Sequence, residues 1–171
     1  QTYLNGTYYN SIDQASQAMI EESTFYLGGP TTAFTASGYY DAERSDSVYG
    51  SNPVSTVQKI GLIYPSDYGY ATAGGSTISQ EACLAMSLAS WSSSRFSDCR
   101  NNDYLYNSSD YEWLQNPIAS NSTFASYVHN TGGVNSTGGD SANGARPALY
   151  LTSETKIVNG VGTSSDPFIL G

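Results

Sequence analysis

The stretch from residue 101 to residue 145 constrains the fold more than any other part of this chain. Asn, Ser, Thr and Gly supply 23 of its 45 residues, and it contains no Lys or Arg. Aromatic side chains are interleaved with these polar residues, from Tyr104 to Tyr127. Long polar tracts are often disordered, but disordered tracts are poor in aromatic residues. We therefore expect an ordered surface of long polar loops carried on short strands.

The residues before this tract predict two helices. Ser11 and Gln14 have the spacing of a capping box, and apolar residues at helical spacing follow them. A second capping box begins at Thr77 and predicts a helix over 79–92, with Cys83 on its inward face. Residues 30–58 are mostly Ser, Thr, Gly, Tyr and Asn, and we expect loops with short pieces of strand there.

Short apolar runs predict the strands. One is 60–64, which ends at Pro65, and the others are 148–151, 156–158 and 168–170. The Asn159-Gly160 dipeptide is typical of a hairpin turn. Together these elements predict an α+β fold for a single domain spanning residues 1–171, with two helices and short antiparallel strands.

Cys83 and Cys99 are the only two thiols in the sequence. A metal site built on cysteine needs a Cys-x-x-Cys pair or nearby histidines, which the sequence lacks. Only 12% of the residues are charged while small polar residues abound, and this composition is typical of secreted bacterial proteins. An even number of cysteines in a secreted chain favours a disulfide, so we expect a Cys83–Cys99 bond. Two free buried cysteines are the alternative.

The charge distribution excludes several partners. The formal net charge is −9, and the six Lys and Arg residues are scattered singly, whereas a nucleic-acid binder needs clustered cations. We therefore expect neither nucleic acid nor a membrane surface among the partners. The sequence contains no run of 18 apolar residues, the length that a membrane-spanning helix needs. The chain opens on Gln1, and we expect a targeting or anchoring segment upstream of it.

The residues needed for catalysis are sparse. His129 is the only histidine and lies in a loop-like stretch. The sequence has no Gly-x-Ser-x-Gly motif, so it offers no nucleophilic serine for which His129 could act as general base. Asp110 and Glu112 form one of the few close acidic pairs, as a carboxylate-dependent glycoside hydrolase would need. We expect no enzymatic activity, and such a hydrolase ranks third among the functions considered.

Calcium is the one cofactor that the composition allows. Asp103, Asp110, Glu112 and Asp140 lie among many Asn side chains, and carboxylate and amide oxygens are calcium's preferred ligands. No Asp-x-Asp-x-Asp-Gly loop is present, so solvated acids are the favoured interpretation and no cofactor is expected.

A series of segments carries a resemblance to a known family. The segments are Lys59-Ile-Gly-Leu-Ile-Tyr-Pro-Ser-Asp-Tyr-Gly-Tyr-Ala-Thr72, Asn102-Asp-Tyr-Leu-Tyr106, Glu112-Trp-Leu114, Gly144-Ala-Arg-Pro-Ala-Leu-Tyr-Leu151 and Gly160-Val-Gly-Thr-Ser-Ser-Asp-Pro-Phe-Ile-Leu170. In this order they resemble an extracellular domain family of gut-associated Gram-positive (Firmicutes) bacteria, often carried behind a prepilin-type helix. The resemblance implies a pilin-like protein at the bacterial cell surface.

A Trp ahead of a polar tract, with a Gly-x-Arg-Pro strand after it, is also similar to the superfamily of C-type lectins and formylglycine-generating enzymes. That similarity implies a compact frame with long ligand-binding loops. The lectin calcium motifs Glu-Pro-Asn and Gln-Pro-Asp are absent, as are the reactive cysteines of the formylglycine-generating enzyme. The similarity therefore implies the compact frame for this chain, but neither calcium binding nor oxidase chemistry.

Two functions remain. In the first, the chain is a recognition and adhesion domain that binds a protein or glycan, because Tyr, Ser, Gly and Asn make adaptable binding surfaces. Trp113 is expected to be framework, and the expected ligand-binding residues are Tyr104, Tyr106, Tyr111, Asn121, Tyr127, Asn130 and Asn135. In the second, the chain is a structural pilin-like subunit that forms a homopolymer.

Overall fold

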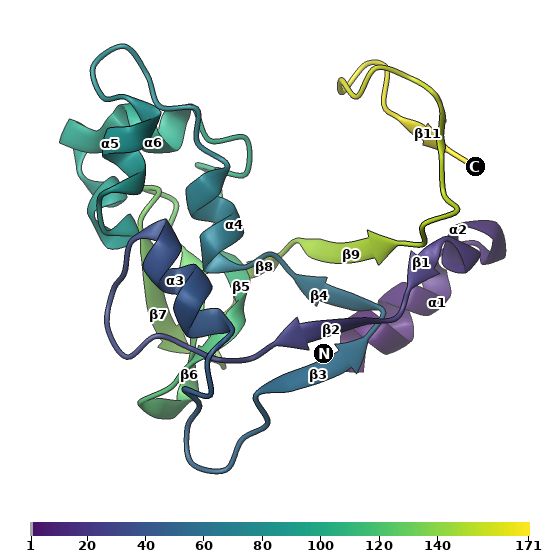
Figure 1. The fold of residues 1–171 in the computed structure, drawn as a ribbon, viewed down its shortest axis with the longest axis horizontal. Helices are drawn as coiled ribbons and strands as arrows, with labels where there is room; N and C mark the ends of the chain where they lie inside the picture. The colour runs from purple at the N-terminus through teal and green to yellow at the C-terminus, as the bar shows by residue number, and fades with distance from the viewer. Residues whose placement is uncertain (1) are drawn as a thin grey trace. The chain divides into compact units, whose positions relative to one another are not determined.

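Residues 2–171 are described by the structure, a computed structural model (Figure 1). It contains both helices and strands, which confirms the predicted α+β class. The chain divides into two units, each assembled from separate segments. The larger unit comprises 25–56 and 62–147, and the smaller unit comprises 1–24, 57–61 and 148–171. The paired strands β2 (Ser23–Tyr26) and β3 (Ser55–Gln58) each contribute residues to both units.

A four-stranded sheet forms the centre of the larger unit. Its order is β7-β6-β5-β8, with β5 (Glu112–Ile118), β6 (Asn121–Val128), β7 (Val134–Gly138) and β8 (Gly144–Ala145). The first three strands are antiparallel, and β8 runs parallel to β5. Side chains alternate across a strand, and accordingly Leu114 and Val128 are buried while Trp113, Tyr127 and His129 beside them are partly exposed.

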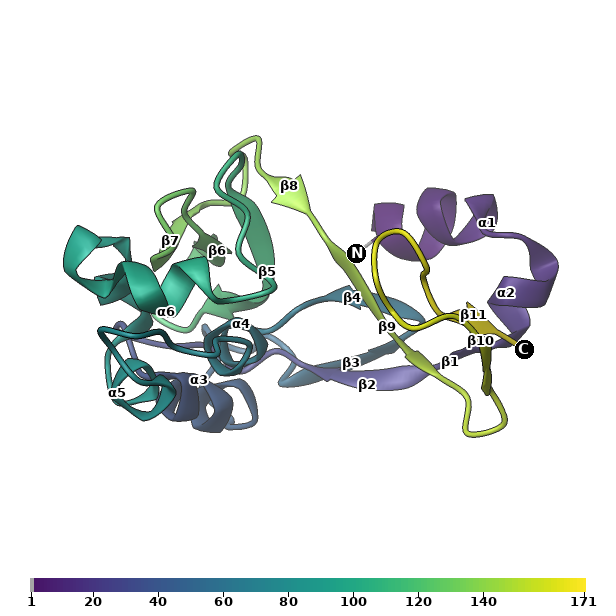
Figure 2. The same cartoon turned by 90° about the horizontal axis from the view of Figure 1, so that it is seen from above.

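Helices cover one face of this sheet. They are α3 (Ala36–Glu43), α4 (Pro65–Tyr70), α5 (Gln80–Leu84), the 3-10 helices η2 (Leu88–Ser92) and η3 (Ser94–Phe96), and α6 (Ser97–Asn101). Figures 1 and 2 show α3 and α4 on the same side of the sheet, and α4 contacts β5. The core between the layers contains Tyr68, Leu88 and Trp91, all fully buried.

The smaller unit has a three-stranded sheet and a separate two-stranded one. The first has the order β1-β9-β4, with β1 (Ile20–Glu21), β9 (Pro147–Leu151) and β4 (Ile60–Leu62). The second pairs β10 (Ile157–Asn159) with β11 (Ile169–Leu170). Three helical segments precede β1, namely the π-helix η1 (Leu4–Tyr8), α1 (Tyr9–Ser11) and α2 (Gln14–Ala18).

The prediction of two helices is wrong. The first predicted helix exists as α2, but Asp13 rather than Ser11 caps it, because the Asp13 carboxylate accepts the Ser16 backbone N–H. The predicted helix over 79–92 is broken into α5 and η2, and Ser79 rather than Thr77 is the cap of α5.

Several helices lie where the sequence predicted none, among them α3 and α4. Thr35 caps α3, whose buried residues Ala36, Tyr39 and Glu43 recur at helical spacing within a stretch of weak helix formers. Pro65 ends the predicted strand, as expected, but it also occupies the first turn of α4, where a proline costs no hydrogen bond.

The tract over 101–145 is loop only in part, because 22 of its 45 residues lie on the strands β5–β8 that carry the loops. Ten of the 23 small polar residues of the tract lie on these strands, where Ser126 and Asn116 are fully buried. The similarity to the C-type-lectin frame stays a prediction. The strands expected at 60–64, 148–151, 156–158 and 168–170 are confirmed as β4, β9, β10 and β11.

The predicted disulfide is confirmed. Cys83 on α5 is bonded to Cys99, and both residues are fully buried. Cys99 lies on the short helix α6. Among the described residues, no helix combines the length and the apolar character needed to cross a bilayer.

Candidate functional site

The outer face of the four-stranded sheet carries a row of side chains that crosses all four strands. Trp113 on β5 pairs with Tyr127 on β6, and Tyr127 pairs with Asn135 on β7. Ala145 on β8 lies beside Trp113 on the other side. The residues that flank Trp113 and Tyr127 along their strands are buried, so these two rings lie on the face opposite the helices.

Tyr111 and His129 extend this row into an aromatic cluster. The Tyr111 and His129 ring centroids are 4.6 Å apart, and those of Tyr111 and Tyr127 are 5.8 Å apart at 87°. Trp113 and Tyr127 are also edge to face, at 6.3 Å and 76°. We call Tyr111, Trp113, Tyr127 and His129 the aromatic platform.

A hollow of about 220 Å³ adjoins the platform. His129 and Asn135 line it together with Ser92 and Thr131, so the hollow offers hydroxyl, amide and imidazole groups. Its volume is below the range of about 300–1,000 Å³ typical of pockets for drug-sized ligands. The hollow therefore suits a single small polar moiety at the end of a larger ligand.

The tautomer of His129 is fixed by its neighbour. The Thr131 backbone N–H donates to His129 Nδ1 at 3.1 Å, and the Thr131 hydroxyl lies 2.8 Å from the same atom. A backbone N–H only donates, so Nδ1 accepts and the neutral ring carries its proton on Nε2. His129 thus presents one hydrogen-bond donor from a fixed ring.

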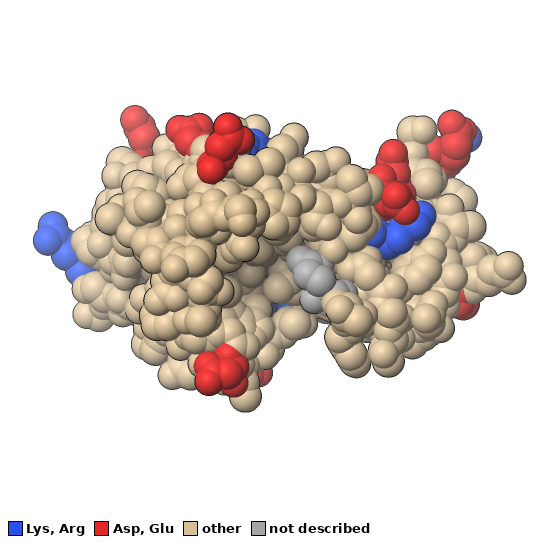
Figure 3. Space-filling model, turned by 90° about the horizontal axis from the view of Figure 1, so that it is seen from below, with Lys and Arg blue, Asp and Glu red and all other residues tan. Residues whose placement is uncertain are grey.

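The platform is uncharged while His129 is neutral. Burial, and to a smaller extent the nearby Tyr111, raises the pKa of the Tyr127 hydroxyl, so this group stays a neutral donor and acceptor. Charge is sparse elsewhere too, since Figure 3 shows Asp, Glu, Lys and Arg in a few separate places on the face drawn. Contacts at the platform would therefore depend on ring faces and neutral hydrogen bonds.

The structure brings together three of the seven predicted ligand-binding residues, Tyr111, Tyr127 and Asn135. Tyr106 and Asn130 support the platform's end, since the Tyr106 hydroxyl donates to the Asn130 carbonyl at 2.6 Å. The remaining two lie elsewhere in the fold.

Tyr104 lies in the turn after α6 and is 81% exposed. Asn121 begins β6, six residues before Tyr127, and at about 3.3 Å per residue it lies roughly 20 Å from that ring. Its side chain caps its own turn by accepting the Thr123 N–H. Neither residue belongs to the platform.

Trp113 and His129 are platform residues that the sequence analysis missed. Trp113 was expected to be framework, but it is only partly buried. Both residues follow a platform tyrosine by two positions, as Tyr111-x-Trp113 and Tyr127-x-His129. Two-residue spacing places side chains on the same face of a strand, so this alternation was the signal that could have found them.

The acids considered for calcium do not assemble into a site. Among residues 2–171, no group of three or more His, Cys, Asp or Glu side chains is close enough to hold a metal ion. Glu112 is buried beneath the sheet and paired with Arg146 at 2.8 Å, whereas Asp110 is exposed. This also removes Asp110 and Glu112 as a facing carboxylate pair.

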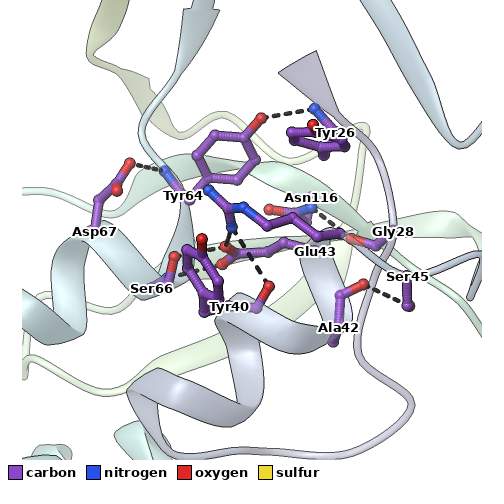
Figure 4. Close-up of polar contacts among 11 residues, drawn as sticks. Tyr26, Gly28, Tyr40, Ala42, Glu43, Ser45, Tyr64, Ser66, Asp67 and Asn116 are labelled. Carbon is purple, nitrogen blue, oxygen red and sulfur yellow. Dashed lines mark hydrogen bonds and ion pairs between the residues drawn. The ribbon is translucent and has the colours of Figure 1, made fainter. Parts of the chain in front are cut away.

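A second polar cluster lies around the buried carboxylate of Glu43 (Figure 4). It accepts the Ser66 N–H and hydroxyl and pairs with Arg44 at 3.0 Å. The Arg44 guanidinium lies 3.7 Å from the centre of the Tyr40 ring and 5.5 Å from those of Tyr26 and Tyr64. Ser66 lies on α4 and Glu43 on α3, so the cluster joins these helices.

Burial raises the pKa of Glu43 despite these partners, and a raised pKa marks candidate catalytic acids. Glu43 is fully buried, however, and no substrate could touch it. The cluster is therefore structural, and the aromatic platform is the candidate site. No protein-family model, curated protein or solved structure matches this chain.

Proposed function

We propose that the chain is a recognition domain of the bacterial cell surface that acts by binding a ligand at the aromatic platform. The observation that carries this proposal is the row Ala145, Trp113, Tyr127 and Asn135 across the sheet. Large rings on regular strands form a rigid surface, because the strands fix their backbone positions and each ring has few rotatable bonds.

A glycan is the ligand class that this surface favours over a protein. The C–H faces of a sugar ring can pack on Trp113 and Tyr127, while its hydroxyls can pair with Asn135, Thr131 and the Nε2 proton of His129. The adjoining hollow has room for one small polar moiety. Binding centres for proteins are rich in Arg as well as Trp and Tyr, and the platform contains no Arg.

Binding rather than catalysis is supported by the lack of a facing carboxylate pair among the described residues, since Asp110 is exposed whereas Glu112 is buried. Glu112 is held in an ion pair, and Glu43 is buried between α3 and α4. Neither can present a free carboxylate to a ligand on the outer face. The surface location is supported by the Cys83–Cys99 bond, because disulfides persist in oxidising compartments.

The experiment is a screen of neutral oligosaccharides on a glycan array, followed by titration of the best binder with each variant. Tyr127→Ala and Tyr111→Ala are expected to weaken binding roughly thirtyfold, which corresponds to about 2 kcal/mol each. Trp113→Ala should weaken it by a similar factor. Tyr104→Ala is the matched control, since Tyr104 is exposed but lies off the platform, and it should bind as wild type does.

Two results would count against the proposal. If no oligosaccharide binds but a host or bacterial surface protein does, and the same variants weaken that binding, the platform recognises protein instead. If Tyr104→Ala weakens binding more than the platform variants do, the contact surface lies elsewhere.

A further inference from the structure

The smaller unit leaves most of its apolar side chains in contact with solvent. Among its described residues, only Leu4, Ile20 and Ile60 are buried apolar side chains. The strands β9, β10 and β11 expose Leu149, Leu151, Ile157, Val158 and Ile169. Isolated apolar residues on a surface are ordinary, but a contiguous group of them marks a contact site.

One part of this surface is a hollow. It has a volume of about 320 Å³ and is lined almost entirely by apolar side chains from α2, β1, β9 and β11 and the residues beside them. Ile12, Met19, Leu149, Leu151 and Leu170 form most of its wall. We call it the apolar groove.

The other part projects from the β10–β11 pair. Val158 is 62% exposed, Val161 69%, and Phe168 and Ile169 52% each. With roughly 100 Å² exposed per side chain, these four present about 400 Å², the size of the largest apolar patch on a typical monomer. We call them the hairpin knob. A two-stranded pair is only marginally stable in water when nothing covers it.

We propose that the apolar groove of one copy of this chain receives the hairpin knob of a second copy. The same unit carries an apolar hollow and an apolar projection, so a second copy supplies the complement of each. Groove and knob are different surfaces, so the contact is head to tail, and it continues into a chain of copies unless the rotation closes a ring.

The size of the contact predicts its strength. A knob of about 400 Å² and a comparable area of groove would bury about 800 Å² in total, which is below the roughly 1,200–2,000 Å² of stable interfaces and typical of weak, transient ones. Association should therefore be weak and reversible, and it should become visible only at high protein concentration. This assembly does not depend on the aromatic platform, and the two proposals can fail separately.

The test is sedimentation velocity over a range of protein concentrations, with one variant for each half of the contact. Leu149→Glu places a charge in the groove and leaves the knob intact. Val158→Glu with Ile169→Glu does the reverse. Each should raise the dissociation constant for self-association at least tenfold. Val54→Glu is the matched control, because Val54 is an exposed valine of the larger unit, and it should associate as wild type does.

The mixture of the two variants is the decisive sample. The intact knob of Leu149→Glu can enter the intact groove of the Val158→Glu/Ile169→Glu chain, so the mixture should form a 1:1 complex and stop there. The proposal is overturned if wild type stays monomeric near 1 mM, if either variant associates as wild type does, or if the mixture forms no complex. Far-ultraviolet circular dichroism checks folding, and Leu149→Ser and Val158→Ser replace any variant that fails to fold.

Discussion

Trp113 and Tyr127 are direct cross-strand partners on β5 and β6, and their rings meet edge to face with centroids 6.3 Å apart. The pair is on the outer face of the sheet, where Trp113 is partly exposed. The other tryptophan, Trp91, is fully buried and lies 5.6 Å from the Tyr68 ring. The chain therefore contains one tryptophan for packing and one that a ligand can reach.

Truncating the two tryptophans should separate stability from binding. Trp91→Ala is expected to lower the free energy of unfolding by about 3–5 kcal/mol, because it leaves a cavity in the core. Trp113→Ala should lower it by less, about 2 kcal/mol, because it removes a cross-strand aromatic pair and the burial of a ring that is only partly covered. Urea denaturation followed by circular dichroism measures both. Equal losses for the two variants would place Trp113 in the core and contradict its role in the platform.

Reduction of the Cys83–Cys99 bond should destabilise the larger unit. The bond closes a loop with a sequence separation of 16, which the chain-entropy model values at about 3 kcal/mol. Thermal unfolding with and without a phosphine reductant measures the loss. A Cys83→Ser/Cys99→Ser variant serves as the control, because it should already melt at the lower temperature and ignore the reductant. Alkylation of both thiols in unreduced, denatured protein would show that the bond does not form.

The sequence allowed the elements with strong local signals to be predicted. The disulfide, β4 and the three strands after residue 146 are confirmed, because apolar runs, turn dipeptides and paired cysteines act over short distances. Helix α3 was missed since its stretch contains Ser, Gly and Tyr, and tertiary packing of Ala36, Tyr39 and Glu43 overrides that weak propensity.

The residues of the aromatic platform could be predicted from the sequence only in part, because the sequence does not show which face of the sheet the helices cover. The two-residue alternation of Tyr111 with Trp113, and of Tyr127 with His129, indicates a shared face on each strand. It does not say which face the helices cover. That depends on α4 packing against β5 on the Leu114 side, a contact between segments about fifty residues apart. Trp113 was therefore assigned to the framework although it lies on the solvent face.

Asn5 should be essential for the smaller unit. Its side-chain oxygen accepts the backbone N–H groups of Lys59 and Ile60, and its amide donates to the Ile60 carbonyl at 2.7 Å. Asn5→Ala would leave these partly buried backbone groups without that partner, at a cost of about 1–3 kcal/mol for an unsatisfied group. Asn135→Ala is the matched control, because the exposed Asn135 side chain accepts the N–H of its neighbour Ser136 and, within residues 2–171, no other backbone N–H. It should change stability by less than about 0.5 kcal/mol. Urea denaturation of both variants checks the difference, and equal stabilities would show that the Asn5 contacts contribute nothing.

Asp103 should make the protein less stable as the pH rises from acid to neutral. One carboxylate oxygen accepts the Leu105 N–H at 2.8 Å, while the other is buried and has no hydrogen-bond partner among the described residues. Burial raises the pKa of Asp103 to about 7, and the Leu105 N–H and the charge of Arg146 offset only part of this effect. In the unfolded chain the pKa is about 3.9.

Between these two pKa values the folded state binds more protons at Asp103 than the unfolded state does. The contribution of the neutral acid to stability is therefore complete below about pH 4 and is lost as the pH rises through about 7, at a cost of up to a few kcal/mol. Asp103→Asn keeps the shape without the charge, so its free energy of unfolding should fall less than that of wild type between pH 4.5 and pH 7.5. Asp110→Asn removes an exposed acid and should keep the wild-type slope. Urea denaturation at four pH values in this window gives the slopes, and parallel slopes for wild type and Asp103→Asn would mean that the folded protein holds Asp103 ionised throughout.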